Sequence, residues 1–147
     1  MLTPFSDEYF MKKALLEAQS AFEKGEIPVG AVVVCDNRVI AKSHNLTELL
    51  NDVTAHAEMQ SITAAANFLG GKYLKGCTMY ITLEPCQMCA GALYWSQINR
   101  VVFGASDTQR GYRTMGVKLH PKTQITSGIL EQECAELIVR FFQQKRK

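Results

Sequence analysis

Two short segments of the chain carry residue types that bind metals. The segment TAHAEM places His56 and Glu58 two residues apart, and the segment LEPCQMCAG contains Cys86 and Cys89 as a C-x-x-C pair. A structural zinc site closes with four protein ligands, whereas a catalytic site uses three and leaves one position for water. His56, Cys86 and Cys89 supply three ligands, and a second ligand pair of the zinc-finger kind is absent from the sequence. The pattern therefore predicts a catalytic zinc site.

Glu58 stands too close to His56 in the sequence to join the same tetrahedron easily. A carboxylate aimed at the open position would instead move protons to and from a water there. A glutamate in isolation is most often a solvated helix residue, but its place beside His56 favours a role as general acid and base.

Two other interpretations of the cysteines remain open from the residues alone. A thioredoxin-type redox pair has neighbours of the W-C-G-P kind, whereas here a proline precedes the first cysteine. A purely structural zinc site would need Cys77 or Cys35 as its fourth ligand. Both fit better as small buried residues of strands.

Composition and charge indicate one globular domain that spans residues 1–147, with 20% charged and 47% hydrophobic residues. No apolar run reaches the roughly 20 residues that cross a membrane. The first residues include acids and lack the basic start of a signal peptide, so we expect a cytoplasmic protein without a membrane partner. The odd number of cysteines, five, argues against a disulfide framework in such a reducing compartment.

The elements that must position the metal-binding residues alternate between helix and strand, which favours an α/β fold with helices on both faces of a mixed sheet. Thr54 is expected to cap the helix that carries His56, and Pro85 to open the helix that carries the cysteines. Helix N-termini there would favour thiolate ligands. The full set of expected elements is a helix over about 6–24, a hairpin turning at 36–37, a helix over 54–68, a strand over 77–83, a helix over 85–96, a strand over 100–105, an irregular loop over 109–122, a short strand over 124–129 and a helix over 130–144.

The motifs HAE and PCQMC resemble the H-x-E…P-C-x-x-C signature of zinc nucleobase deaminases. Further segments, IPVGAVVV, TLEPCQMCAGAL, RVVFGASD and ITSGILEQECAELI, are similar to bacterial tRNA adenosine deaminases along nearly the whole chain. The resemblance implies a three-layer α/β/α sandwich with a mixed, about five-stranded sheet of the cytidine-deaminase kind. It also implies a homodimer that converts adenosine to inosine at the wobble position of a tRNA anticodon arm.

The same resemblance implies roles for single residues. One Zn²⁺ per subunit would be held by His56, Cys86 and Cys89, with Glu58 as the proton shuttle. The flipped base would be held by the Asn45 side chain and by main-chain groups near Ala57.

Two further residues gain a role from the family. Val29 would pack on the base, and Asp107 would lie near the ribose of a flanking nucleotide. Considered alone, Val29 is a strand residue, Asp107 is a helix cap, and Asn45 is a turn residue.

Basic residues near the loop and the chain end are expected to contact RNA phosphates, although a solvated helix end explains the tail equally simply. These candidates are Arg110, Arg113, Lys145, Arg146 and Lys147.

One segment departs from the bacterial family. The segment TQRGYRTMGVKLHPK differs from the usual K-[TS]-G-A-like run and is shorter, which bears on the nucleotide contacts more than on the chemistry. The run EPCQMCAGALYW also resembles guanine deaminases, so Trp95 is either part of the helix core or a sign of free-base specificity. Deamination of free guanine or cytosine is therefore the alternative function.

Overall fold

A computed structural model describes residues 4–145 of the chain. Within that range the elements are α1 (Asp7–Glu23), β1 (Gly30–Cys35), β2 (Arg38–His44), α2 (Ala57–Leu69), β3 (Cys77–Leu83), α3 (Gln87–Ser96), β4 (Arg100–Ala105), β5 (Gln124–Ser127) and α4 (Glu131–Lys145). None of these helices is long and apolar enough to span a bilayer.

The five strands form one mixed sheet in the order β2-β1-β3-β4-β5. β1 runs antiparallel to both of its neighbours, while β3, β4 and β5 are parallel. β1 and β2 are joined by Asp36 and Asn37, whose φ angles of 51° and 62° are left-handed. Such a two-residue turn matches the twist of a hairpin, and Asn and Asp tolerate its backbone. The expected hairpin is therefore confirmed.

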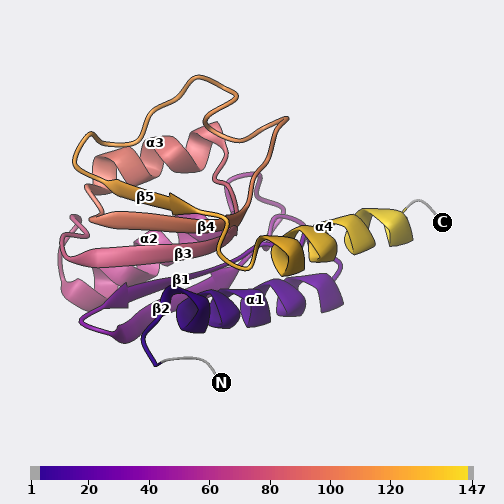
Figure 1. Cartoon of the computed structure of the whole chain (residues 1–147), viewed down its shortest axis with the longest axis horizontal. Helices are drawn as coiled ribbons and strands as arrows, with labels where there is room; N and C mark the ends of the chain where they lie inside the picture. Colours follow the sequence, from indigo (N-terminus) through magenta and orange to yellow (C-terminus); the bar gives the residue numbers. More distant parts are fainter. Residues whose placement is uncertain (1–3, 146–147) are drawn as a thin grey trace.

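Helices cover both faces of the sheet, and Figure 1 shows α1 and α4 side by side on one face with α2 and α3 on the other. Alternate residues of β1 serve the two layers, as expected for a strand buried on both faces. Val33 packs in the cluster that includes Ala57 and Leu93 from α2 and α3. Val32 packs with Phe10 of α1. The predicted three-layer α/β/α sandwich is confirmed.

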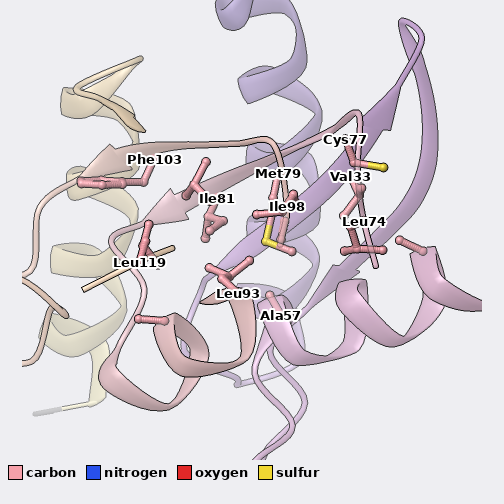
Figure 2. Packing of buried hydrophobic residues seen from close by; sticks show 14 of the residues in the cluster. Val33, Ala57, Leu74, Cys77, Met79, Ile81, Leu93, Ile98, Phe103 and Leu119 are labelled. Atoms are coloured by element: carbon pink, nitrogen blue, oxygen red, sulfur yellow. The ribbon is translucent and has the colours of Figure 1, made fainter. Parts of the chain in front are cut away.

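The larger cluster of buried residues lies between the sheet and helices α2 and α3. Figure 2 shows Met79, Ile81 and Phe103 on the sheet side of this cluster, with Ala57 and Leu93 on the helix side. Each of these side chains is at most 1% exposed. Because Ala57 is the first residue of α2, this packing fixes the start of that helix against the sheet.

Two predicted helix starts are wrong by a few residues. Thr54 does not cap α2, because its backbone N–H and hydroxyl both donate to Asp52 Oδ1, at 2.8 and 2.7 Å, and close a separate turn. The helix has His56 as its N-cap. Pro85 precedes the N-cap of α3, which is Cys86. His56 and Cys86 thus occupy the cap positions themselves, and Cys89 lies in the first turn of α3.

Candidate active site

Four chain segments meet at one edge of the sheet, where β3 and β4 end. Because β1 is antiparallel to β2 and β3, its first residue lies beside the last residue of β2. The backbone N–H of Asn45 donates to Val29 O at 3.1 Å, and the N–H of Glu84 donates to Ala105 O at 2.8 Å. We call this the site edge, defined by Val29, Asn45, Glu84 and Ala105. Ligand sites of α/β proteins form where such strand ends meet.

His56, Cys86 and Cys89 lie together beyond this edge, as predicted. His56 Nδ1 is 3.7 Å from Cys86 Sγ and 3.5 Å from Cys89 Sγ. Tetrahedral zinc, with bonds of about 2.3 Å to sulfur and 2.0 Å to nitrogen, would hold nitrogen and sulfur roughly 3.5 Å apart. Among residues 4–145, no fourth histidine, cysteine, aspartate or glutamate joins this group. The donor set and its spacing therefore fit a three-ligand zinc site.

The four-ligand alternative is not supported by the position of the other candidate cysteines. Cys35 and Cys77 face each other as partners across β1 and β3, within the sheet and apart from the metal group. Neither offers a fourth ligand to His56.

The pKa values of the two thiols in this group are shifted in opposite directions. Hydrogen bonding from the Cys89 thiol, and then from His56, lowers the pKa of Cys86 to about 4. The pKa of Cys89 is raised, first by its hydrogen bond to Cys86 and then by burial. Hydrogen bonding to Cys86 also raises the pKa of His56. At neutral pH the group therefore already carries one sulfur anion, at the N-cap of α3, which prepares it for a cation.

Glu58 lies in the first turn of α2 and is only 4% exposed. Burial raises the pKa of its carboxyl to about 7. A carboxyl with a pKa near the working pH both accepts and releases a proton readily, which is the property that general acid–base catalysis requires.

Hydrogen bonds join the start of α2 to the end of β2. Ser43 Oγ donates to Ala57 O at 2.7 Å and lies 2.6 Å from Ser61 Oγ. The Gln60 side chain donates to His44 O at 2.8 Å. These bonds fix the metal-binding turn relative to Asn45, the next residue of the chain after β2.

Asn45 is 6% exposed, and its Oδ1 is the one buried side-chain oxygen or nitrogen within residues 4–145 that lacks a hydrogen-bond partner. A buried polar atom without a partner costs free energy, so it indicates a position that a ligand completes. Val29 is buried beside it, and Ala57 is fully buried. The structure thus brings three of the expected base-binding residues to the same edge.

Asp107 follows β4 at the site edge, but it does not cap a helix. Its Oδ1 accepts hydrogen bonds from the backbone N–H groups of Gln109 and Arg110, at 3.1 and 2.9 Å, and these bonds close a turn. The expectation of a helix cap is wrong in that respect, because the segment after β4 continues as turns up to β5.

Sequence reasoning missed the role of Glu84, which is 4% exposed. Its carboxylate accepts the backbone N–H of Asp107 at 3.0 Å, and three N–H groups of Arg113 at 3.0 to 3.2 Å. Burial alone would raise the pKa of Glu84, but the Arg113 and backbone hydrogen bonds outweigh it and lower the pKa. Because these partners lie 23 and 29 residues away, no local pattern could have indicated the contact.

Glu26 was missed as well. It is 1% exposed, and its two carboxylate oxygens accept the backbone N–H groups of Glu48 at 3.0 Å and Leu49 at 2.8 Å. A second buried glutamate therefore holds the loop that links Asn45 to His56. The only signal in the sequence is an acid set directly before Ile27 and Pro28.

The expected phosphate contacts lie in different surroundings. Arg110 is exposed, and Lys145 lies with its Nζ 5.4 Å from the centre of the Phe141 ring. Arg146 and Lys147 lie outside the described residues.

Trp95 is 76% exposed and meets Tyr94 edge-on, with ring centres 5.6 Å apart. The interpretation of Trp95 as helix core is therefore wrong, because the outer face of α3 is open at this position.

Comparison with known proteins gives a family match over most of the chain. The model of the cytidine and deoxycytidylate deaminase zinc-binding region matches residues 4–105, which include the group of His56, Cys86 and Cys89. The tRNA-specific adenosine deaminase of Agrobacterium fabrum is 46% identical over 144 residues, which cover 94% of this chain and 95% of that protein.

Solved structures give the same picture. A chain from a study of A-to-I editing by tRNA:A34 deaminases at the wobble position of transfer RNA superposes with a TM-score of 0.83 and 45% identity, covering 88% of this chain and 98% of that one. The guanine deaminase of Bacillus subtilis superposes with a TM-score of 0.66 and 41% identity, covering 69% of this chain and 65% of its own.

Proposed function

The chain belongs to the cytidine and deoxycytidylate deaminase family, and we propose that it is a zinc-dependent hydrolase that converts adenosine to inosine at the wobble position of a transfer RNA. The observation that carries this proposal is the group of His56, Cys86 and Cys89 with Glu58 buried beside it. The relatives that act on tRNA cover nearly the whole chain, which supports the choice of substrate.

One zinc ion per subunit would be held by His56 Nδ1 and by the sulfurs of Cys86 and Cys89. When bound, zinc lowers the pKa of a water in its open position to ~7, which supplies a nucleophile at neutral pH.

Glu58 performs the proton transfers. The buried carboxyl, placed beside the three proposed ligands, takes a proton from the attacking water. It delivers this proton to the adenine ring nitrogen as the water oxygen bonds to C6. It then takes the proton of the new C6 hydroxyl and delivers it to the amine, so that the C–N bond breaks, ammonia leaves and the C6 carbonyl of inosine remains. The buried position of Glu58 excludes competing bulk water from these steps.

The base is held at the site edge. The unpartnered Oδ1 of Asn45 accepts a hydrogen bond from the flipped nucleoside, and Val29 packs on the base. Main-chain groups near Ala57 meet its opposite side, and Asp107 lies near the ribose of a flanking nucleotide. Phosphates of the anticodon arm are contacted by the exposed Arg110 and by the basic end of the chain from Lys145 to Lys147.

The protein acts as a homodimer in the cytoplasm. Exposed apolar side chains support the pairing, since Leu49, Leu50 and Val53 are 67%, 53% and 83% exposed on the loop before α2. A groove of about 450 Å³ lies beside them, lined in part by Leu50 and Met59.

The test is an inosine assay on zinc-loaded protein. An anticodon stem-loop with adenosine at the wobble position is compared with free guanine and free cytosine, and each substrate is also tested after chelation of the metal. Inosine in the stem-loop, lost on chelation and restored by Zn²⁺, supports the proposal. Xanthine from guanine or uracil from cytosine, with the stem-loop unchanged, favours the free-base alternative that the guanine deaminase similarity raises.

A further inference from the structure

We propose that Glu84 is a positioning residue which, through Arg113, holds the segment 106–117 against the cysteine ligand segment in the form that receives the RNA. This inference rests on the proposed function for its substrate, and it assigns Arg113 an anchoring role instead of a phosphate contact. The segment lies beyond the part of the chain that matches the family model, which ends at residue 105.

The carboxylate of Glu84 is fully engaged by this segment. Oε1 accepts the backbone N–H of Asp107 and an N–H of the Arg113 guanidinium, both at 3.0 Å. Oε2 accepts the backbone N–H and the Nε–H of Arg113, at 3.2 and 3.1 Å. The Glu84 side chain is 2% exposed and that of Arg113 is 50% exposed, so the carboxylate is shielded from water while the arginine is not. Hydrogen bonds to a buried charge are among the strongest that a protein makes.

Backbone contacts bring the same segment onto the metal-binding loop. Tyr112 N–H donates to Pro85 O at 2.9 Å, and Gly111 forms an isolated antiparallel bridge with Cys86. Position 111 has no room for a side chain, because a Cβ there would overlap the Glu84 carboxylate. Segment 106–117 therefore contacts both the Glu84 carboxylate and the backbone of Cys86, one of the proposed ligands.

The guanidinium of Arg113 binds protein groups on its inner side, although the Arg113 side chain is 50% exposed. Besides Glu84, it donates to Ser106 Oγ at 2.9 Å, and it lies 5.0 Å from the centre of the Phe103 ring. Arg110 of the same segment is exposed, and no side-chain partner for it occurs within residues 4–145. The two arginines thus form a natural pair for comparison, one an anchor and one free to meet phosphate.

Glu84 acts on the substrate through Asp107. Because the Asp107 amide is bound to Glu84, and the Asp107 carboxylate closes the next turn, loss of the anchor frees the whole turn at the mouth of the site. The chemistry at Glu58 is untouched by this change. The expected signature is weaker RNA binding with little change in the chemical step.

The experiment compares Glu84→Gln, Arg113→Met, the double variant and Arg110→Met with the parent protein. Glutamine places an NH₂ group against two N–H donors whichever way it is oriented. We expect KM for the stem-loop to rise about tenfold in Glu84→Gln and in Arg113→Met, with kcat changed less than about threefold. KM of the double variant should be no higher than that of the single variant with the higher KM, because each single substitution already removes the same Glu84–Arg113 interaction.

Salt dependence separates the two arginines. A phosphate contact that is lost lowers the slope of log affinity against log salt by about one. We expect this change for Arg110→Met and an unchanged slope for Arg113→Met. A reduced slope for Arg113→Met, or a double variant whose effects simply add, overturns the proposal.

Amide hydrogen exchange without RNA gives a readout that does not depend on the substrate. Exchange of the amides of residues 107–113 should accelerate at least tenfold in Glu84→Gln and Arg113→Met, while that of α2 stays constant. Unchanged exchange in Arg113→Met overturns the anchor even if Glu84→Gln fails to fold. If the parent protein makes no inosine but the exchange accelerates, the proposed function has failed and the anchor has not.

Discussion

Glu58 and Glu84 are equally buried, each 4% exposed, and each stands within two residues of a metal-binding side chain. Their pKa values are nevertheless shifted in opposite directions. Burial raises the pKa of Glu58 to about 7, whereas four N–H donors, three of them from Arg113, lower the pKa of Glu84 against the effect of burial. Burial alone therefore does not decide the charge of a glutamate.

The opposite pKa shifts indicate which of the two carboxylates suits proton transfer and which suits a fixed structural contact. A carboxyl without a dedicated cation partner can exchange its proton, as a general acid and base must. A carboxylate matched with an arginine and amides keeps its charge and serves as a fixed attachment point. The two roles lead to four predictions that separate the residues.

Glu58→Gln should give the largest effect, a loss of kcat of at least 10³-fold with zinc content unchanged, because the proposed proton shuttle is removed while the proposed ligands stay. Single-turnover inosine formation and metal analysis of the same sample measure both quantities. The matched variant Glu84→Gln should keep kcat within about threefold. If Glu58→Gln keeps its turnover, the contrast between the two residues has no catalytic meaning.

The pH dependence of stability should have opposite signs for the two residues in the metal-free protein. The folded pKa of Glu58 lies above its ordinary 4.5, so the contribution of Glu58 to the free energy of unfolding falls as pH rises from about 4.5 to about 7, by about 3 kcal/mol. The lowered pKa of Cys86 contributes a rise over the same range, so the two must be separated by a variant. The folded pKa of Glu84 lies below 4.5, so its contribution is complete above that pH and is lost on acidification below it.

Denaturant unfolding at a series of pH values measures both slopes. The difference between the parent and Glu58→Gln should fall between pH 4.5 and 7, and the difference between the parent and Glu84→Gln should appear only as a loss in acid. Slopes of the same sign for both residues would contradict the assignment.

Gly111→Ala should raise KM roughly five- to tenfold, since the added methyl group displaces the Glu84 carboxylate from its donors. Gly91→Ala is the matched control, because its Cβ meets no atom within 4 Å and alanine favours a helix. Stem-loop kinetics on both variants give the answer. Equal KM values in the two variants would show that the carboxylate need not be where the structure has it.

Lys145→Gln should have the smallest effect, a two- to threefold weaker RNA affinity with a salt slope lower by about one. The Lys145 side chain is exposed, whereas Glu58 and Glu84 are both buried, so its loss disturbs little of the surrounding structure. Binding titrations at several salt concentrations measure it. An RNA affinity that does not vary with salt would contradict all of the proposed phosphate contacts.

The sequence predicted the strands and the metal group well, for physical reasons. The bounds of β3 and β4 follow from runs of β-branched and aromatic residues ended by acid, proline or polar residues, and these signals are local. His56, Cys86 and Cys89 were grouped correctly because ligand type and number limit the possible sites.

The misses arose where contacts that the local pattern does not specify decided the outcome. Thr54 has a good capping side chain, but Asp52 binds it first. Trp95 has the side chain of a core residue, yet nothing within the described chain covers it. The burial of Glu84 depends on Arg113, which lies 29 residues further on, and such a contact leaves no periodic trace.

The way in which segment 106–117 is attached also bears on how it can change over evolution or by engineering. Apart from the turn at Asp107 and the Glu84 pair, its contacts with the cysteine loop are backbone bonds, which any amino acid except proline can make. A graft from a relative therefore needs glycine at position 111, an aromatic core residue in place of Tyr112, which is 4% exposed and meets Phe103 edge-on, and an arginine at position 113. Replacing this segment could therefore change the nucleotide preference of the protein while the proposed catalytic residues stay unchanged.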